Sequence, residues 1–179
     1  MRYVAFLRAI NVGGHTVRME ALRRQFESIG ATNVETFIAS GNVIFETARR
    51  NADALERAIE DHLRTALGFP VGTFLRTIPE LDAVAAHAPF PESELAAGAT
   101  MYVAFLKKAA GAQARAAVAA LRNPVDDLAL HGRELYWLRR NYVGESMLPP
   151  SAFDKAKLGD TTTRNVTTVR KLAAKYCGR

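Results

Sequence analysis

The chain has 179 residues, of which 49% are hydrophobic and 23% charged, a balance typical of a globular protein rather than a disordered or fibrous one. It contains no apolar run near the roughly 18 residues that a membrane span needs, and its short apolar N-terminus is followed by no signal-peptide cleavage site. Its single cysteine, Cys177, cannot form an internal disulfide, so we expect a cytoplasmic protein without membrane contact.

The net charge of +6 is distributed unevenly along the chain. Residues 1–90 hold 10 basic and 10 acidic residues, whereas residues 91–179 hold 14 basic and 8 acidic residues. The excess is most marked over 151–179, with 7 basic and 2 acidic residues. Such a stretch can attract phosphate groups or nucleic acid, although a solvated basic surface explains it at least as well.

The first half predicts strands and helices in the order βαββαβ, which is typical of a ferredoxin-like unit. We expect strands over 2–10, 33–39, 43–47 and 71–76, and helices over 18–29 and 51–67. The helix over 18–29 shows the clearest pattern, because its apolar residues recur at three- and four-residue spacing and Gly30 follows it. Ser40-Gly41-Asn42 predicts a tight hairpin turn between the second and third strands.

The second half predicts a similar but less regular order. We expect a connecting helix over 78–87, a linker over 88–99, strands over 100–107, 127–131 and 134–139, and helices over 112–121, 151–158 and 163–175. No clear eighth strand is predicted, so either this half has lost it or residues 140–150 supply it. We place the boundary near residue 90, which gives units over 1–90 and 91–179.

A five-residue repeat supports duplication of one unit. Tyr3–Leu7 and Tyr102–Leu106 both read YVAFL, and a basic residue follows each. We expect these segments to be equivalent central strands, buried on both faces because the apolar run is continuous. The hairpin turns at Gly41 and Gly132 should then be equivalent. The predicted fold class is α+β, with two tandem ferredoxin-like (βαββαβ-type) units and antiparallel sheets.

Two polar clusters in the first half are candidate binding sites. Arg8 precedes a glycine-bearing loop that contains Asn11, Gly13, Gly14 and His15. Paired glycines can turn backbone N–H groups toward an anion, but the loop lacks the ending of a phosphate-binding P-loop, and a flexible crossover turn is an alternative. The second cluster holds Ser40 and Asn42, which a hairpin turn alone also explains.

A third cluster, Thr161–Asn165, is expected where the last helix begins. The threonine hydroxyls could cap the free N–H groups of that helix, or Thr163, Arg164 and Asn165 could bind an anion there. We expect Arg8, the glycine loop and this segment to meet and bind one anion together.

The aromatic residues of the second hairpin and the histidines give weaker signals. Tyr136 and Trp137, with two arginines behind them, could stack on nucleic acid bases, although alternation in a strand core explains them equally well. The four histidines have no metal-ligand spacing, and the sequence indicates neither a metal nor a cofactor.

The sequence resembles a bacterial family catalogued as domain of unknown function family 1697. The resemblance rests on Phe6–Gly14, Ser40–Val43 and Thr163–Leu172 and extends over essentially the whole chain. It implies a pair of ferredoxin-like α/β units and no activity. The chain departs from the family pattern at Val166, where the family usually has tryptophan, and at Met147, where relatives often have lysine.

Three functions follow as hypotheses. The favoured one is a binding module for a phosphate-bearing ligand, either a nucleotide or nucleic acid. The alternatives are a small-molecule enzyme at a cleft between the units, using Ser40, Asn42 or His15, and a structural or protein-interaction module. The sequence specifies neither a reaction nor an oligomeric state.

Overall fold

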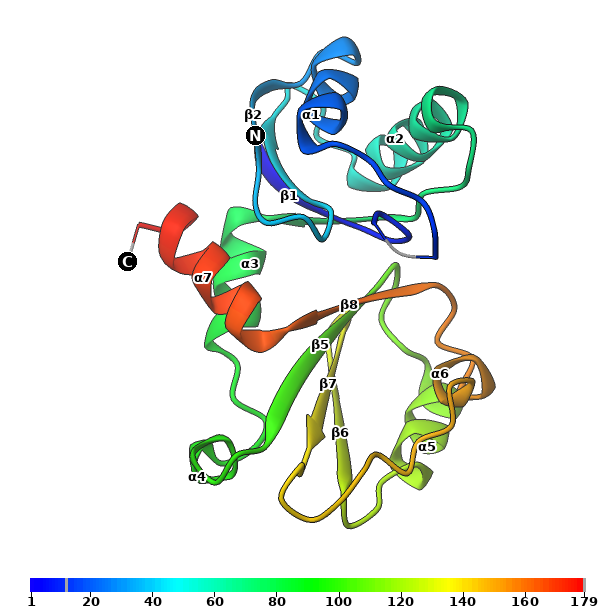
Figure 1. The fold of residues 1–179 in the computed structure, drawn as a ribbon, viewed down its shortest axis with the longest axis vertical. Coiled ribbons are helices and arrows are strands. Elements are labelled where there is room, and N and C mark those ends of the chain that lie inside the picture. The colour runs from blue at the N-terminus through cyan, green and yellow to red at the C-terminus, as the bar shows by residue number, and fades with distance from the viewer. Residues whose placement is uncertain (12, 179) are drawn as a thin grey trace. The chain divides into compact units, whose positions relative to one another are not determined.

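The computed structural model describes residues 1–11 and 13–178, which form two compact units (Figure 1). The first unit comprises Met1–Asp82 together with the C-terminal residues that begin at Lys175, and the second comprises Ala83–Ala174. The division falls within helix α3 (Ile78–Ala86).

The first unit has the order βαββαβ, and its sheet has the strand order β2-β3-β1-β4. Its elements are β1 (Arg2–Leu7), α1 (Met19–Ser28), β2 (Thr32–Thr36), β3 (Asn42–Glu46), α2 (Ala52–Leu67) and β4 (Thr73–Thr77). All strand pairs are antiparallel, and α1 and α2 cover one face of the sheet (Figure 1). Helix α2 has clear end signals, because the Asn51 side chain accepts a hydrogen bond from Ala54 N and the left-handed Gly68 follows its last turn.

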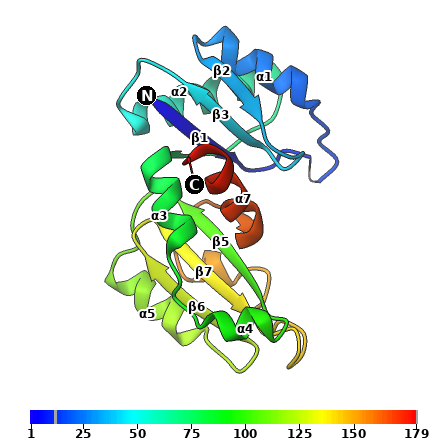
Figure 2. The ribbon, with the colours of Figure 1, turned by 90° about the vertical axis from the view of Figure 1, so that its left-hand side faces the viewer.

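The second unit repeats this order. Its elements are α4 (Glu92–Ala96), β5 (Thr100–Leu106), α5 (Ala112–Ala120), β6 (Asp126–His131), β7 (Glu134–Arg139), α6 (Ala152–Lys155), β8 (Thr161–Asn165) and α7 (Val166–Tyr176). The sheet order is β6-β7-β5-β8, and Figure 2 shows β6, β7 and β5 side by side. The chain is therefore two tandem α+β units, as predicted.

The central strand β1 is buried on both faces, which confirms the interpretation of its continuous apolar run. Tyr3, Ala5 and Leu7 pack in the core formed with α1 and α2, and each is at most 1% exposed. Val4 and Phe6, whose side chains alternate to the opposite face, are 0% exposed. Both backbone edges of β1 are also paired, with β3 and with β4.

The strand registers confirm that Tyr3–Leu7 and Tyr102–Leu106 are equivalent. Tyr3 lies opposite Phe45 and Thr77, and Tyr102 lies opposite Trp137 and Asn165. By the same registers, Arg76 on β4 is equivalent to Arg164 on β8, and both side chains are buried.

The two hairpin turns are equivalent, but their glycines are offset by one residue. Leu7 N donates to Gly41 O at 2.8 Å, whereas the equivalent Leu106 N donates to Arg133 O at 2.9 Å. The offset follows from turn length, because residues 38–41 connect the first hairpin and only residues 132–133 connect the second. The first turn is therefore wider than the tight turn that the sequence predicted.

The C-terminal half of the second unit corrects the sequence prediction. Thr161–Asn165 is not the start of a helix but the eighth strand, paired antiparallel with β5, and helix α7 begins only at Val166. The two predicted alternatives, that the strand was lost or that residues 140–150 formed it, were both wrong. The segment is polar but rich in β-branched threonine, and pairing with β5 favours the extended backbone.

Two smaller differences have local causes. Helix α6 is a single turn that ends at Lys155 rather than at 158, and the left-handed backbone of Lys157 follows it. The linker over 88–99 contains the short helix α4, which was not predicted. Within the described residues, no helix has the length and apolar character to cross a membrane.

The C-terminal residues are attached to the first unit by a charged cluster around Glu35 on β2. Lys175 Nζ lies 3.0 Å from Glu35 Oε2, Tyr176 Oη donates to the same oxygen at 2.9 Å, and Arg2 Nη2 lies 3.2 Å from Oε1. Hydrogen bonds from Lys175 and Tyr176 lower the pKa of Glu35, so the carboxylate stays ionised at neutral pH.

The buried face of β1 gives a direct test of the core. Phe6→Ala should lower the free energy of unfolding by about 3–5 kcal/mol, because a 0% exposed phenylalanine leaves a cavity. The equivalent Phe105→Ala should cost a similar amount, whereas Met147→Ala, at a 63% exposed site, should change stability by less than about 0.5 kcal/mol. Urea denaturation followed by circular dichroism measures all three. A cost below about 1 kcal/mol for Phe6→Ala would contradict the assignment of β1 to the core.

Candidate ligand-binding loops

The first two predicted clusters lie together at one end of the first sheet. Because β1 and β3 are antiparallel, the segment leaving β1 meets the turn that enters β3. Leu7 N donates to Gly41 O, and Arg8 N donates to Gly72 O at 2.7 Å, which fixes the start of the segment beside both neighbouring strands. We refer to residues 8–11, 13–15 and 37–42 as the loop cluster.

Two asparagines hold the loop cluster together. Asn11 Nδ2 donates to Ala39 O at 2.8 Å, and its Oδ1 accepts from Val17 N at 2.7 Å, so one side chain joins both loops. Asn42 is 0% exposed, and its Nδ2 donates to Phe37 O and Ser40 Oγ. These contacts give Asn11 and Asn42 positioning roles within the cluster.

The backbone of the loop cluster is strained. Among the described residues, five that are not glycine have a positive φ, and three of them, Ala9 (67°), Asn11 (55°) and Ile38 (51°), belong to this cluster. Left-handed backbone costs most residues with a Cβ about 1–2 kcal/mol; asparagine adopts it more readily, and β-branched residues such as Ile38 adopt it least readily. Strain of this kind persists only where the surrounding structure enforces it, and it concentrates at functional sites.

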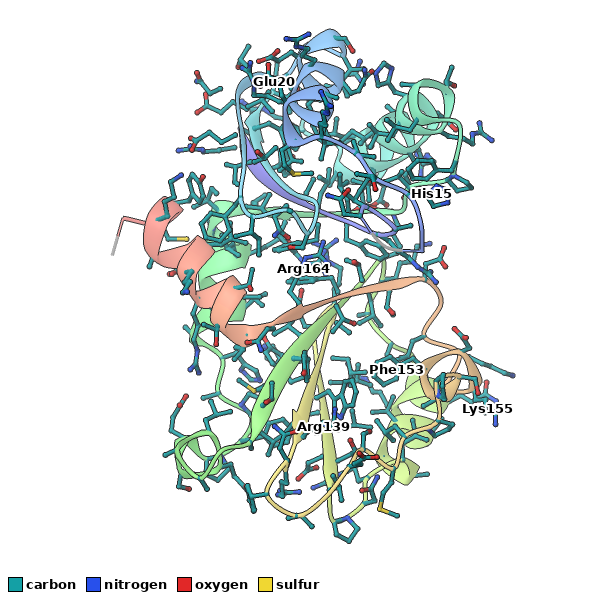
Figure 3. All side chains as sticks on the ribbon, in the orientation of Figure 1. His15, Glu20, Arg139, Phe153, Lys155 and Arg164 are labelled. Atoms are coloured by element: carbon teal, nitrogen blue, oxygen red, sulfur yellow. The ribbon has the colours of Figure 1, made fainter. Side chains whose placement is uncertain are left out.

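Cationic and hydrogen-bonding groups are exposed on the cluster. Arg8, Gly13, Gly14 and His15 are exposed, and Ser40 is half-buried. The His15 ring stacks on Phe69 with centroids 4.0 Å apart and planes at 17°, and Figure 3 shows His15 near the chain that follows α2. Helix α1 begins only at Met19, so the N–H groups near Arg8 belong to the loop backbone rather than to a helix N-terminus.

Phe69 and Gly72 belong to this environment but were not predicted. A Cβ at Gly72 would lie 3.4 Å from Arg8 Cβ, so a glycine there lets β4 approach the end of β1 closely. No local pattern marks either residue, because both contacts join segments far apart in the sequence.

The third predicted cluster lies in the second unit. Arg164 is 8% exposed, and its Nη1 donates to Thr162 Oγ1 and Thr163 O, both at 2.9 Å. Burial lowers the pKa of Arg164 to about 10, so it is still charged at neutral pH. Asn165 Oδ1 accepts from Thr167 N at 2.8 Å and caps α7, whereas the sequence had pointed to the threonine hydroxyls for this capping role. A joint site with Arg8 stays a prediction.

The second hairpin offers less to a nucleic acid than its sequence suggested. Tyr136 is 0% exposed and donates to Val84 O at 3.2 Å, so it has no free face on which a base could stack. Arg140 is held by Glu94 at 3.0 Å and Asp127 at 3.3 Å. Trp137 is half-buried. In the described part of the chain, no group of three His, Cys, Asp or Glu side chains could hold a metal ion.

The second unit contains a pair of stacked histidines. The His87 and His131 rings lie 4.1 Å apart at 18°. Burial and the nearby His131 lower the pKa of His87 below its ordinary 6.5, and Glu134 opposes this only in part. The folded state therefore binds this proton less readily than the unfolded chain does.

We accordingly expect the free energy of unfolding to fall as pH decreases from about 7.5 to about 5.5, since the unfolded state protonates first. His87→Gln should flatten this dependence, and His131→Gln should reduce it by removing the neighbouring charge. Urea titrations at several pH values within this window provide the measurement. An unchanged slope for His87→Gln would contradict the assignment.

Glycines test the geometry of the loop cluster. A Cβ at Gly41 (φ 73°) would lie 3.0 Å from Ile10 Cβ and 3.1 Å from Leu7 Cβ, whereas a Cβ at Gly13 (φ 62°) would meet nothing within 4 Å. Gly13→Ala should cost about 1–2 kcal/mol from backbone strain alone. Gly41→Ala should cost at least about 1 kcal/mol more, because the neighbouring backbone must shift. Chemical denaturation compares the two, and equal costs would mean that the loops are not packed this closely.

Comparison with known proteins identifies the family and supports the fold. The model of a family described as "Protein of unknown function (DUF1697)" matches residues 1–136, and the last segment on which the resemblance was based lies beyond them. The chain is also similar to a solved structure described as that of conserved bacterial protein SP0830 from Streptococcus pneumoniae, with 23% identity, 97% of each chain covered and a TM-score of 0.72. No curated protein matches. The family match spans most of the sequence, and the chain belongs to the family of proteins of unknown function DUF1697.

Proposed function

We propose that this protein binds a phosphate-bearing ligand and that the loop cluster contacts the phosphate. The observation that carries the proposal is the combination, in one place, of an exposed arginine, exposed glycines and a strained backbone. Arg8, Gly13 and Gly14 supply the groups, and Asn11 holds their loop against the hairpin.

The chemistry of the cluster favours an anion. The sequence contains no aspartate or glutamate over 8–15 or 37–42, so these two segments add no negative charge to the cluster. A guanidinium can donate two parallel hydrogen bonds to a phosphate, and glycine-rich loops bring backbone N–H groups close to one. His15 adds a ring nitrogen near the same loop, with its ring orientation fixed by Phe69.

Strain in the backbone of the loop cluster also favours a binding role. Ala9, Asn11 and Ile38 each adopt a conformation that costs free energy, and the bonds to Gly41, Gly72 and Ala39 enforce it. Backbone strain of this kind clusters at ligand-binding and active sites. A preformed loop reduces the conformational entropy lost when a ligand binds.

Thermal denaturation with inorganic phosphate tests the proposal. At a concentration of about ten times Kd, binding to the folded state should stabilise it by about 1.4 kcal/mol and raise the Tm by about 3–6 °C. Arg8→Ala should abolish this increase, and Arg8→Lys should retain part of it, since lysine keeps the charge but not the paired donors. The matched control is Arg57→Ala, an exposed arginine on α2, which should respond as the parent does. An Arg8→Ala variant that is stabilised as much as the parent would refute the proposal.

The source of the phosphate requires separate measurements. A nucleoside triphosphate and a short single-stranded oligonucleotide should be compared with inorganic phosphate in the same assay. Nucleic acid binding would weaken steeply with salt, because several phosphates release counterions together, whereas a mononucleotide would show a shallower dependence. Loss of either response in Arg8→Ala would assign that ligand to the loop cluster.

A further inference from the structure

The second unit has a hollow beside its only tryptophan. Trp137 on β7 forms one wall, and the chain from Ser146 through helix α6 forms the rest. The hollow has a volume of about 260 Å³ and is lined by Trp137, Ser146, Leu148, Pro149, Pro150, Ala152 and Phe153.

The duplicated fold explains why this face is hollowed. Trp137 occupies the register position of Phe45 in the first unit, where the ring is 1% exposed and contacts Phe26 of α1 at 5.1 Å. In the first unit the second helix, α2, extends over Ala52–Leu67, whereas its counterpart α6 is only the single turn Ala152–Lys155. The shortened helix leaves part of the sheet face around Trp137 uncovered.

Several contacts fix the indole in place. Trp137 Nε1 donates to Asp126 Oδ1 at 2.9 Å, and the ring lies 5.2 Å from Tyr102. Phe153 meets it edge-on, at 5.9 Å and 89°, and Figure 3 shows Phe153 on the side of α6 toward the sheet. An aromatic wall held in this way loses little freedom when a ligand stacks on it.

The opposite wall is attached to the same carboxylate. Asp126 is 0% exposed and accepts from Ser146 Oγ at 2.8 Å and from Met147 N at 2.7 Å. Burial alone would raise the pKa of Asp126, but the hydrogen bonds from Ser146, Met147 and Trp137 lower it below its ordinary value. An ionised carboxylate therefore joins both walls, and the hollow is preformed.

The lining disfavours polar and anionic ligands. Pro149 and Pro150 have no backbone N–H to donate. The Ser146 hydroxyl already donates to Asp126 and accepts from Leu148 N at 3.3 Å, so it offers little to a polar ligand. The negative charge of Asp126 also disfavours anions, which separates this hollow chemically from the loop cluster of the first unit.

We propose that this hollow binds a planar, uncharged aromatic group of one or two fused rings, stacked against Trp137. A dry cavity of about 150 Å³ accepts benzene, and drug-sized ligands need about 300–1,000 Å³, so 260 Å³ is suited to a ring system between these limits. Aromatic rings prefer offset or edge-to-face contact with other rings, and Trp137 and Phe153 present such surfaces at right angles.

The single tryptophan makes the test specific, because the protein gives one indole N–H signal in an NMR spectrum. Titration with quinoline at neutral pH should shift that signal saturably, through the ring current of the stacked ligand. Cyclohexanol, which is uncharged but not planar, and inorganic phosphate should produce no saturable shift.

Two variants and a matched control complete the test. Phe153→Ala removes one wall and Leu148→Phe fills the hollow, and each should weaken quinoline binding at least about tenfold. Met147→Ala, beside the hollow but 63% exposed and outside its lining, should bind as the parent does. Circular dichroism establishes that each variant is folded. Absence of a saturable shift in the folded parent, equal binding of cyclohexanol, or unchanged affinity in both lining variants would overturn the proposal.

Discussion

The rest of the structure depends on one constraint, which is that the central strand of each sheet is paired along both edges and largely buried on both faces. Tyr3–Leu7 and Tyr102–Leu106 can satisfy it because every side chain in them is apolar or, for tyrosine, mostly apolar. Polar side chains can then lie only at the ends of the strand. In the first unit the strand ends at Arg8, where the chain must pass between the β2–β3 turn and the start of β4, and the left-handed residues of the loop cluster are concentrated at this crossing.

The sequence predicted most of this architecture because apolar periodicity is strong where elements bury one face. Helices α1 and α2 were placed to within a residue or two, and the YVAFL repeat located both central strands. Strand β8 was missed because Thr161–Asn165 carries no apolar residue, and its extended backbone comes from pairing with β5 rather than from local preference. The glycines marked the loop of the candidate site. The bond from Asn11 to Ala39 could not be predicted, since it joins two segments that only the sheet brings together.

Duplication gave the two units the same registers but left their surfaces free to diverge. The turn over 38–41 in the first unit is wide enough to meet the loop after β1, whereas Gly132-Arg133 in the second closes its hairpin directly. The opposite difference appears on the helical face, where Phe45 is 1% exposed and contacts Phe26 of α1, whereas Trp137, beside the single turn of α6, is half-buried. The two units are therefore open at different places. The length of the turn over 38–41 determines the opening in the first unit, and the length of α6 determines it in the second.

The loop cluster and the hollow beside Trp137 differ in electrostatics because different side chains hold them together. Neutral asparagine side chains hold the loop cluster together, so these supporting groups add no charge to it. An ionised carboxylate, Asp126, holds the hollow beside Trp137 together, and four donors satisfy it within the protein. An amide can join two loops without adding charge, whereas a buried carboxylate places a fixed negative charge behind an apolar lining. The supporting residues thus differ between two copies of one fold. Asparagines give the loop cluster an environment that favours anions, and Asp126 gives the hollow one that favours uncharged rings.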